Sequence, residues 1–394
     1  MASARVLVLG GGFGGLACAH ELRRLVPEVA VAVVDRSPSF VVGATQTWVM
    51  LGRRREEEVA RSRERLRRAG IEYVQAEVTA IDPSRRTATT TGGQLEGDFL
   101  VVALGTELDL DVVPGLAEAA DTFYTLEGAA RLRERLASLV SGRLVLLIPS
   151  VPFKCPPAPY EAAILLHDFF QRRGLRSAVA IEVDTVEPAP MPTAGPTMGA
   201  LIRGELEKRG IAFFPGRQPE RVDAASQTIR FVDGSETSYD LLISVPRHRA
   251  PAVAREAGLA GEEGWIPVDP RSLETAYQAV FAVGDVTVVS LPGRYVPERP
   301  LVLPKAGVFA EAEGKVVAAR IAARIRGEEP KAEFGGEGFC YLELGGEEAV
   351  RADGSFFALP HPAVVVREPS REQYEDKLRW VEEVLEAYLD GREG

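Results

Sequence analysis

Residues 5–35, "RVLVLGGGFGGLACAHELRRLVPEVAVAVVD", decide the fold of this chain. An apolar strand leads into a glycine-rich turn, a helical segment follows, and a second apolar strand ends in Asp35. Gly10, Gly12 and Gly15 give the spacing G-x-G-x-x-G, in which small residues let the backbone approach a pyrophosphate at the helix N-terminus. Asp35 follows Gly15 by 20 residues, where its carboxylate can accept hydrogen bonds from an adenosine ribose. The stretch predicts a strand–helix–strand unit that binds a dinucleotide.

Two later stretches are predicted to be strands that end in small or acidic residues, "DFLVVALGT" (98–106) and "TAYQAVFAVGD" (275–285). The first ends in Gly105 and Thr106, and the second ends in Gly284 and Asp285. They resemble two further signatures of the flavoproteins with two dinucleotide-binding domains, in which the Asp lies against the flavin ribitol. The resemblance implies FAD as the cofactor and an FAD domain built from both ends of the chain.

We therefore expect an α/β fold with two Rossmann-like dinucleotide-binding domains, the FAD domain being split around an inserted NAD-like domain, plus a C-terminal segment. The expected boundaries are 1–110 and 250–330 for the FAD domain, 111–249 for the insert, and 331–394 for a capping or interface segment with a terminal amphipathic helix. The insert repeats the first pattern, with a strand at 143–149, a helix at 160–174 and a strand at 177–184. Its connection, "SVPFKCPPAP", contains no glycine. Side chains at every position would hold a pyrophosphate away from the backbone amides, so NAD(P)H is not an expected substrate.

The composition narrows the possible functions. The chain of 394 residues has 46 basic and 57 acidic side chains, and its net charge of -11 opposes a nucleic-acid or anionic-lipid surface. Its apolar runs are far shorter than the roughly 20 residues of a spanning helix. The N-terminus enters a strand too early for a signal peptide. We expect a cytoplasmic protein that can also lie peripherally on a membrane.

The three cysteines have different surroundings. Cys155 precedes a helix whose first turn includes Pro159, and both the helix dipole and the adjacent Lys154 favour a reactive thiolate there. A buried structural cysteine is the alternative. Cys340, in "GEGFCYLELGG", comes from a distant segment, so the two can meet as a redox pair but cannot alone make a structural zinc site. Cys18 reads as a core residue of the first helix. No metal site is expected.

The cysteine motifs resemble those of a known family. The residues that carry the resemblance are "FKCPPAP" around Cys155, "GFCYLELG" around Cys340, "TWVMLGRR" (47–54) and "LPKAGVFAEAEGKVVAARI" (303–321). They are similar to the sulfide:quinone oxidoreductases and the flavocytochrome c sulfide dehydrogenases, within the FAD-dependent disulfide oxidoreductases. The resemblance implies that Cys155 and Cys340 form the catalytic disulfide, with Cys340 the one to face the flavin. A sulfur nucleophile would open this disulfide, and electrons would pass through FAD to an acceptor.

Three departures from the family bear on the site. "SFVVGATQTWV" has no cysteine to tether a flavin, so FAD should be non-covalent. "DTFYTLEGAARL" lacks the third cysteine of many quinone enzymes, which leaves a two-cysteine site. The quinone enzymes of the family use histidines near the acceptor, but "PMPTAGPTMGALIRGELEKRG" (190–210) contains no histidine. Of the four histidines in the chain, His20 and His167 fall on predicted helices, whereas His248 and His361 fall in predicted loops.

Two charged residues are candidates for chemistry at the site. Glu161, six residues after Cys155, can handle protons if burial raises its pKa, but it can also be an ordinary carboxylate in the first turn of a helix. Lys305 can place positive charge near the reduced flavin or be a solvated loop lysine. The residues expected to bind the cofactor are Gly10, Gly12, Gly14, Gly15, Asp35, Val78, Gly105, Thr106, Gly284, Asp285, Lys305 and Gly307.

The acceptor is the least defined partner. Residues 371–390 predict an amphipathic helix with the apolar stripe Tyr374, Leu378, Val381, Leu385 and Tyr388. Its polar face has seven acidic residues against three basic ones, Lys377 among them, so it should dock on the protein's own core or a second subunit at least as readily as on a bilayer. "FFALPHPAVVV" (356–366) can roof a quinone channel or be a plain strand and turn.

The sequence therefore predicts an FAD-dependent oxidoreductase in which Cys155 and Cys340 oxidise sulfide or a related small sulfur nucleophile and a quinone or other acceptor takes the electrons. A homo-oligomer is compatible with this prediction. The alternatives are an NAD(P)H-dependent quinone or disulfide reductase, and a non-catalytic redox-sensing protein that binds flavin. Neither the sulfur donor nor the length of the sulfur product follows from the sequence.

Overall fold

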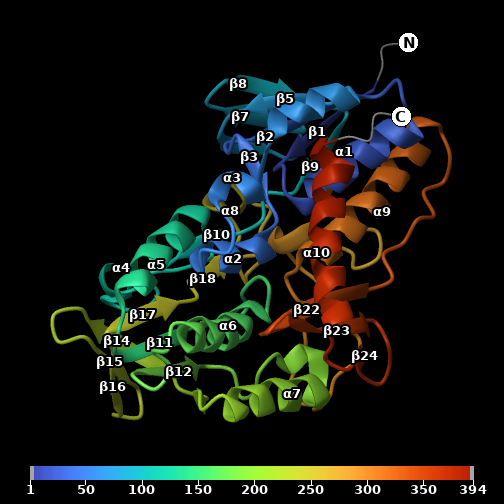
Figure 1. Ribbon diagram of the computed structural model, residues 1–394. Coiled ribbons are helices and arrows are strands. Elements are labelled where there is room, and N and C mark those ends of the chain that lie inside the picture. Colours follow the sequence, from blue (N-terminus) through green and yellow to red (C-terminus); the bar gives the residue numbers. More distant parts are fainter. Residues whose placement is uncertain (1–3, 391–394) are drawn as a thin grey trace.

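The computed structural model describes residues 4–390, and its first parallel sheet unites the two ends of the chain (Figure 1). Its order is β20 (Val280–Ala282), β9 (Phe99–Val102), β1 (Arg5–Leu9), β2 (Ala30–Asp35) and β5 (Glu72–Gln75). The register Val6↔Phe99 and Val280↔Leu100 places β9 between a strand from each side of the insert. This sheet and the one in the insert confirm the predicted α/β class with two Rossmann-like units. The exact domain boundaries stay predictions.

Glycines allow the first crossover to pack closely. Gly10 has φ +105°, and a Cβ on it would lie 2.2 Å from the Ala103 carbonyl oxygen. A Cβ on Gly15 would lie 1.9 Å from the Gly10 carbonyl oxygen. Helix α1 (Phe13–Leu25) therefore lies directly on the turn, and it packs against α9 (Gly307–Ile325) on the same face of the sheet.

The second parallel sheet belongs to the insert. Its order is β13 (Ala212–Pro215), β12 (Val179–Thr185), β11 (Gly142–Ile148) and β17 (Leu241–Ser244). Its helices are α5 (Leu126–Ser138), α6 (Ala158–Arg172) and α7 (Gly195–Lys208). Buried aliphatic residues of β11, β12, α6 and α7 form one core cluster, which explains why this apolar stretch folds as a strand–helix–strand unit.

Short elements complete both units. Two antiparallel meanders consist of β6 (Val78–Asp82), β7 (Thr87–Thr90) and β8 (Gly93–Glu96), and of β14 (Pro219–Asp223), β15 (Thr228–Phe231) and β16 (Glu236–Ser238). The paired strands are β3 (Ser39–Val41) with β4 (Ala60–Ser62), β10 (Glu107–Asp109) with β18 (Arg247–Arg249), and β19 (Ile266–Pro267) with β21 (Thr287–Val288). The short helices are α2 (Gln46–Met50), α3 (Glu56–Val59), α4 (Leu116–Ala119) and α8 (Ala252–Glu256).

Two predicted strands are much shorter in the structure. The predicted strand 275–285 is regular only in β20, because the chain first turns back in a hairpin at Ala279, whose φ is +59°. Glu274 and Phe281 face each other across this hairpin. The predicted strand 98–106 ends at Val102, and Gly105 then adopts a φ of +65°.

A C-terminal unit covers the junction of the two sheets. It contains the antiparallel strands β22 (Glu337–Gly345), β23 (Glu348–Ser355) and β24 (Ala363–Val366), followed by α10 (Arg371–Leu385) and a π-helical turn (Glu386–Asp390). Strand β22 packs on α6, whereas the end of α10 joins the core of α1, so the unit spans both parallel sheets (Figure 1). The predicted terminal helix therefore docks on the protein's own core.

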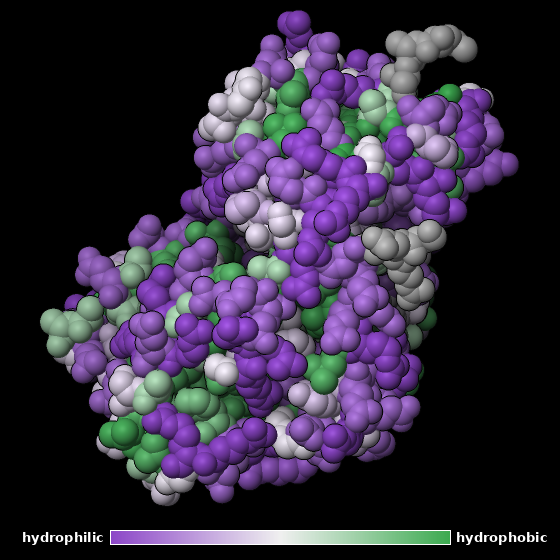
Figure 2. All heavy atoms as spheres, turned by 45° about the horizontal axis from the view of Figure 1, so that its top comes forward, coloured by the Kyte–Doolittle hydropathy of each residue, from purple (hydrophilic) through white to green (hydrophobic). Residues whose placement is uncertain are grey.

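No helix within residues 4–390 is long and apolar enough to cross a membrane. Hydrophilic residues cover most of the face in Figure 2, and hydrophobic residues reach that surface in separate patches.

Candidate functional site

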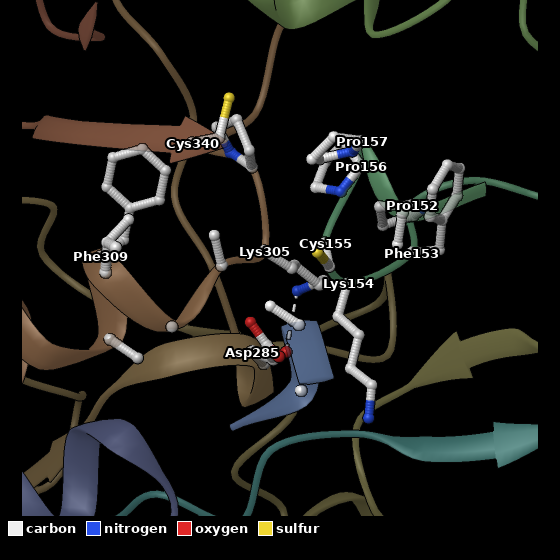
Figure 3. A pocket seen from close by; sticks show the side chains of 18 of the residues that line it. Pro152, Phe153, Lys154, Cys155, Pro156, Pro157, Asp285, Lys305, Phe309 and Cys340 are labelled. Atoms are coloured by element: carbon white, nitrogen blue, oxygen red, sulfur yellow. Dashed lines mark hydrogen bonds between the residues drawn. The ribbon is translucent and has the colours of Figure 1, made fainter. Parts of the chain in front are cut away.

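A cavity of about 600 Å³ lies where the two sheets and the C-terminal unit meet (Figure 3). The first sheet contributes glycine-rich turns at the ends of β1, β9 and β20, the insert contributes residues 151–158, and β22 contributes Cys340. The carboxyl ends of parallel strands are the usual ligand-binding edge of such sheets. The cavity therefore joins segments that are far apart in the sequence.

Most of the predicted cofactor residues lie at this cavity. Those that line it are Gly12, Gly14, Gly105, Gly284, Asp285, Lys305 and Gly307. Gly10 and Gly15 lie behind it and make the close packing described above. Asp35, Val78 and Thr106 are not part of its wall. Val78 begins the β6 meander and packs against the core of the first sheet.

Asp35 organises the glycine turn from the end of β2. Its carboxylate accepts a hydrogen bond from the Gly11 amide at 2.7 Å, and Arg63 Nη2 lies 3.5 Å from the same oxygen. Arg63 was not among the predicted site residues. It is buried, and its Nε donates a hydrogen bond to the Gly11 carbonyl oxygen at 2.9 Å. It also lines the cavity. It lies in the highly charged stretch "RSRERLRR" (61–68), so nothing in the sequence sets it apart.

The site has the space and polar groups that FAD requires. A Cβ added to Gly12 or Gly105 would meet nothing within 4 Å, so these turns leave open space beside the backbone. The Thr106 hydroxyl is buried without a hydrogen-bond partner in the described structure. Asp285 lines the cavity between the two sheets, where a carboxylate can bind the hydroxyls of a ribityl chain. The donor set therefore fits a dinucleotide with its pyrophosphate at the start of α1.

Lys305 is a buried residue and not a solvated loop lysine. Only 7% of it is exposed, and its Nζ donates to the carbonyl oxygens of Asp285 and Thr287, each at 2.8 Å. The ammonium also lies 3.5 Å from the centroid of the Trp265 ring. Burial lowers the pKa of Lys305 to about 8, although Asp285 acts in the opposite direction. A positive group is thus fixed in the cavity wall.

Cys155 lies at the bend between β11 and α6. Its φ is +53°, its amide donates to the Lys305 carbonyl oxygen at 2.7 Å, and its carbonyl accepts from the Ala158 amide at 2.9 Å. These bonds hold the thiol in the cavity wall (Figure 3).

The prediction of a Cys155 thiolate is wrong for this structure. Burial, followed by the nearby Glu161 carboxylate, raises the pKa of Cys155 to about 12. The Ala158 amide at the start of α6 acts in the lowering direction, but burial outweighs it. Lys154 does not help, because its side chain extends away from the sulfur in Figure 3 and lies near the Tyr124 ring.

Cys340 faces the same cavity from β22, where it pairs with Ala352 of β23. Burial and Cys155 raise its pKa to about 12. Cys155 and Cys340 are both free thiols, and in Figure 3 the sulfur of Cys340 is directed away from Cys155. The structure thus brings the two cysteines to one cavity without joining them, so their pairing as a disulfide stays a prediction. Cys18 is buried in α1, as expected of a core residue.

Glu161 belongs to a buried ionic cluster behind Cys155. Lys377 Nζ lies 3.0 Å from both Glu161 carboxylate oxygens and 2.7 Å from Glu343 Oε1. Glu161 also accepts a hydrogen bond from the Glu343 amide at 2.9 Å, and Arg53 pairs with Glu343 at 2.9 Å. Burial raises the pKa of Glu161, although Lys377 opposes this rise. This environment rules out an ordinary first-turn carboxylate.

Lys377 was wrongly assigned to the polar face of the terminal helix. It is 1% exposed, because the face of α10 that packs inward runs through Gln373, Lys377 and Val381. Tyr374 and Leu378, from the predicted stripe, are only half-buried. The positions 373, 377, 381 and 384 also have helical spacing, so the signal was present but was obscured by the charge of Lys377.

The histidines are not arranged as a catalytic group. His248, predicted in a loop, lies in β18 and is 3% exposed. Burial, with the positive charge of Lys154, lowers the pKa of His248 to about 3, so it is neutral. His167 lies on α6 and His20 on α1, as predicted, and the exposed His361 stacks on Tyr295. None of the four lines the described cavity.

The chain matches the family model described as pyridine nucleotide-disulphide oxidoreductase over residues 4–147 and 160–310. The match is interrupted between 147 and 160, at the connection that carries Cys155. The family model matches the residues on both sides of this connection but not the connection itself.

Two curated relatives show what this chain resembles. A sulfide-quinone reductase of Aquifex aeolicus (strain VF5) is 27% identical over 366 residues, which cover 90% of this chain and 83% of that protein. The alternative NAD(P)H-ubiquinone oxidoreductase C1 of Arabidopsis thaliana is 34% identical over 207 residues, covering 47% of this chain and 40% of that protein. The crystal structure of the sulfide:quinone oxidoreductase from Aquifex aeolicus has a TM-score of 0.88 and 24% identity, covering 99% of this chain and 93% of that chain.

Proposed function

The chain belongs to the pyridine nucleotide-disulphide oxidoreductase family, and on this basis we propose that it oxidises sulfide or a related small sulfur nucleophile and passes the electrons through FAD to a quinone. It is an FAD-binding oxidoreductase, as its family and fold show. One observation carries the sulfur assignment. The crossover that would approach a nicotinamide dinucleotide has a cysteine between proline and lysine residues in place of glycines, and a second cysteine faces the same cavity.

The residues for FAD follow from the first sheet. The turn at Gly12 and Gly14 would receive the pyrophosphate, Asp35 would support that turn and face the adenosine end, and Asp285 would bind the ribityl chain. Bound non-covalently, FAD supplies a two-electron sink beside the cysteines and the link to the acceptor. Lys305, fixed beside Asp285, would favour negative charge on the reduced cofactor.

The cysteines provide the route by which sulfur gives up electrons. In the oxidised protein, Cys155 and Cys340 form a disulfide, and hydrosulfide attacks one of its sulfur atoms. The S–S bond between the cysteines breaks, a new S–S bond forms to the incoming sulfur, and the products are one persulfide and one thiolate. Two-electron oxidation of the persulfide and the thiolate would join them by a new S–S bond as a trisulfide, with loss of the persulfide proton, and FAD, when bound, would supply the sink for the two electrons. Hydrosulfide supplies the attacking sulfur, so the step needs no cysteine thiolate at the start. One cysteine must leave as a thiolate, however, and the burial that raises the pKa of Cys155 makes it a slower leaving group unless a proton or positive charge stabilises it.

Glu161 is suited to manage the proton of this step. Its carboxylate is buried near Cys155 and contributes to the raised pKa of that thiol. Lys377 holds both carboxylate oxygens, so Glu161 has a defined orientation. A proton released from the incoming sulfur can therefore be accepted at Glu161 without reaching bulk water. Lys377 acts here as a positioning residue.

The C-terminal side of the cavity is suited to an apolar acceptor. Phe339, Tyr341, Phe356 and Trp380 contribute aromatic surface to the wall opposite the insert. Residues 356–366, predicted to roof a quinone channel, provide part of this wall, and Leu359 and Val365 of this segment are exposed at the surface. An aromatic wall with an apolar rim is the environment in which a quinone ring binds.

The experiment that tests this function compares electron donors. The holoprotein is assayed anaerobically for reduction of a soluble quinone with sulfide, NADH or NADPH as the donor. We expect sulfide to support turnover and the two nicotinamides to support none, because the second crossover has no glycine turn for their pyrophosphate. Turnover with NADH and none with sulfide would contradict the proposal and favour the function of the Arabidopsis relative.

A further inference from the structure

The Lys154 side chain extends along the cavity wall without an acidic partner. The chain turns sharply at Cys155, so Lys154 points away from the sulfur (Figure 3). No carboxylate of the described residues lies within ion-pair distance of its ammonium, although Asp285 acts on it from farther away, and the centroid of the Tyr124 ring lies 6.0 Å from Nζ. Lys154 is half-buried, and burial lowers the pKa of its ammonium, so an anion beside it would stabilise the charged form.

The phenol beside this ammonium also lacks a partner. Tyr124 is 3% exposed and lines the cavity, yet its hydroxyl makes no hydrogen bond to the described chain. Burial raises its pKa well above the ordinary value, so the hydroxyl keeps its proton and can donate. Lys154 and Tyr124 thus present a positive charge and a hydroxyl donor on one stretch of wall.

The acidic group that acts on Tyr124 is Glu187, which also lines the cavity and whose pKa is raised to about 7 by burial, so it carries little negative charge below that pH. The His248 ring packs edge-on against the Tyr124 ring, with 5.2 Å between the ring centroids, and it is uncharged because its pKa is lowered to about 3. Asp285 is the nearest acidic influence on Lys154 and is already drawn toward the Lys305 ammonium. Lys305 itself is bound to two carbonyl oxygens. An anion at Lys154 would therefore complete an otherwise unpaired set of groups.

The backbone holds Lys154 firmly in this position. Lys154 and Lys305 form a parallel bridge, and the following amide, that of Cys155, donates to the Lys305 carbonyl oxygen. The next wall residues are apolar, with Phe153 only 4% exposed and Phe123 only 2% exposed. A small, weakly hydrated anion suits such a wall better than a large polar one.

We propose that Lys154 and Tyr124 form a receiving site for the hydrosulfide anion, one residue from Cys155, before it attacks the disulfide. The inference rests on the proposed function and assigns its substrate form. The Lys154 ammonium neutralises the anion, and the Tyr124 hydroxyl donates a hydrogen bond to its sulfur. Hydrogen sulfide and the hydrosulfide anion are both present near neutral pH, so the anion is available to such a site.

The test measures binding without chemistry. In a Cys155→Ser/Cys340→Ser background, which cannot form the disulfide, sulfide is titrated anaerobically while the absorbance of the bound flavin is recorded. We expect saturable perturbation, with the dissociation constant raised by about tenfold or more in Lys154→Met, the effect of losing a charge-assisted hydrogen bond. Lys154→Arg should retain most of the affinity. Lys331→Met, which alters an exposed lysine, is the matched control and should not change it.

Two results would overturn the site. Equal sulfide affinity in Lys154→Met and in the control would show that the ammonium does not receive the anion. Loss of FAD from Lys154→Met, measured as flavin content after gel filtration, would show that Lys154 binds an anionic group of the cofactor. Failure of this site can be distinguished from failure of the proposed function. If the protein binds sulfide through Lys154 but does not reduce quinone, the binding site stands and the proposed reaction does not. A Tyr124→Phe variant supports the site if it weakens sulfide binding with flavin content unchanged.

Discussion

Two crossovers occupy equivalent places in the two parallel sheets, one from β1 to α1 and the other from β11 to α6. The first crossover is rich in glycine, whereas the second has proline and cysteine. In the first, the lack of side chains lets the helix approach the strand and leaves open space at Gly12. In the second, the turn at Cys155 brings a thiol into the cavity wall. The same topology thus leaves open space beside the backbone at one turn and places a thiol in the cavity wall at the other.

The comparison also shows how the second crossover is supported. Its helix has Pro159 in the first turn, and Glu161 in the same turn reaches Lys377 of the C-terminal unit. Within residues 4–390, the first crossover has no comparable ion pair with the C-terminal unit. There α10 contributes an aromatic contact, with Trp380 stacked on Phe13 at 6.2 Å between ring centroids. The C-terminal unit therefore supports the second crossover by charge and the first by apolar packing.

The largest expected effect comes from breaking the ionic support of the second crossover. Lys377→Met leaves Glu161 and Glu343 buried without their shared cation, and we expect it to lower the free energy of unfolding by about 3–5 kcal/mol. Urea denaturation of the holoprotein measures this. Lys315→Met, which removes an exposed lysine paired with Glu311 on α9, should cost less than about 0.5 kcal/mol. A loss below about 1 kcal/mol in Lys377→Met would mean that the cluster does not support α6.

The next effect concerns the packing of the first crossover. Gly15→Ala places a Cβ 1.9 Å from the Gly10 carbonyl oxygen, so we expect destabilisation by about 1–3 kcal/mol together with loss of FAD. Thermal unfolding and flavin content give the two readouts. Gly204→Ala on α7 meets nothing within 4 Å and serves as the control, with stability unchanged or slightly raised. Full flavin content in Gly15→Ala would contradict the close-packing role.

A smaller effect concerns a buried carboxyl of the insert. Glu187 accepts a hydrogen bond from the Tyr160 hydroxyl, and burial raises its pKa from 4.5 to about 7. The folded protein keeps this proton where the unfolded chain has lost it, so the free energy of unfolding falls as the pH rises from about 4.5 to 7. We expect Glu187→Gln to remove this fall and to be more stable at pH 8 by about 1–3 kcal/mol.

Chemical denaturation at several pH values between 5 and 8 tests the Glu187 prediction. The exposed Glu348→Gln variant provides the comparison, and its pH profile should follow that of the unaltered protein. A Glu187→Gln profile with the same slope as the unaltered protein would show that the carboxyl does not hold its proton in the folded state.

The smallest effect on stability is expected at Gly12. A Cβ there meets nothing within 4 Å and the backbone φ of -87° suits alanine, so Gly12→Ala should change the free energy of unfolding by less than about 0.5 kcal/mol. The space is proposed to be that of the cofactor, so FAD should dissociate more readily. Equilibrium dialysis of the flavin measures this, and unchanged FAD affinity would remove Gly12 from the binding surface.

The sequence predicted both parallel units and the position of Cys155 before α6, because each depends on local pattern and spacing, but it left open whether Glu161 is buried. It did not predict that Lys377 turns inward, since charge alone suggested an exposed face, and only the contact with Glu161 and Glu343 makes burial favourable. The direction of Lys154 and the raised pKa of Cys155 were also missed. Both follow from the sharp turn at Cys155 and from burial by segments that are distant in the sequence, and neither can be inferred from the residues next to Cys155.

The central claim is that the second crossover brings sulfur chemistry to the flavin, and anaerobic stopped-flow absorbance tests it most directly. The holoprotein is mixed with sulfide beside the Cys155→Ser and Cys340→Ser variants, and Cys18→Ala, which alters a buried cysteine outside the cavity, is the control. We predict rapid bleaching of the flavin in the unaltered protein and the control, and loss of the rapid phase in both cavity variants. A flavin that stays oxidised, or cavity variants that react as fast as the control, would contradict the claim.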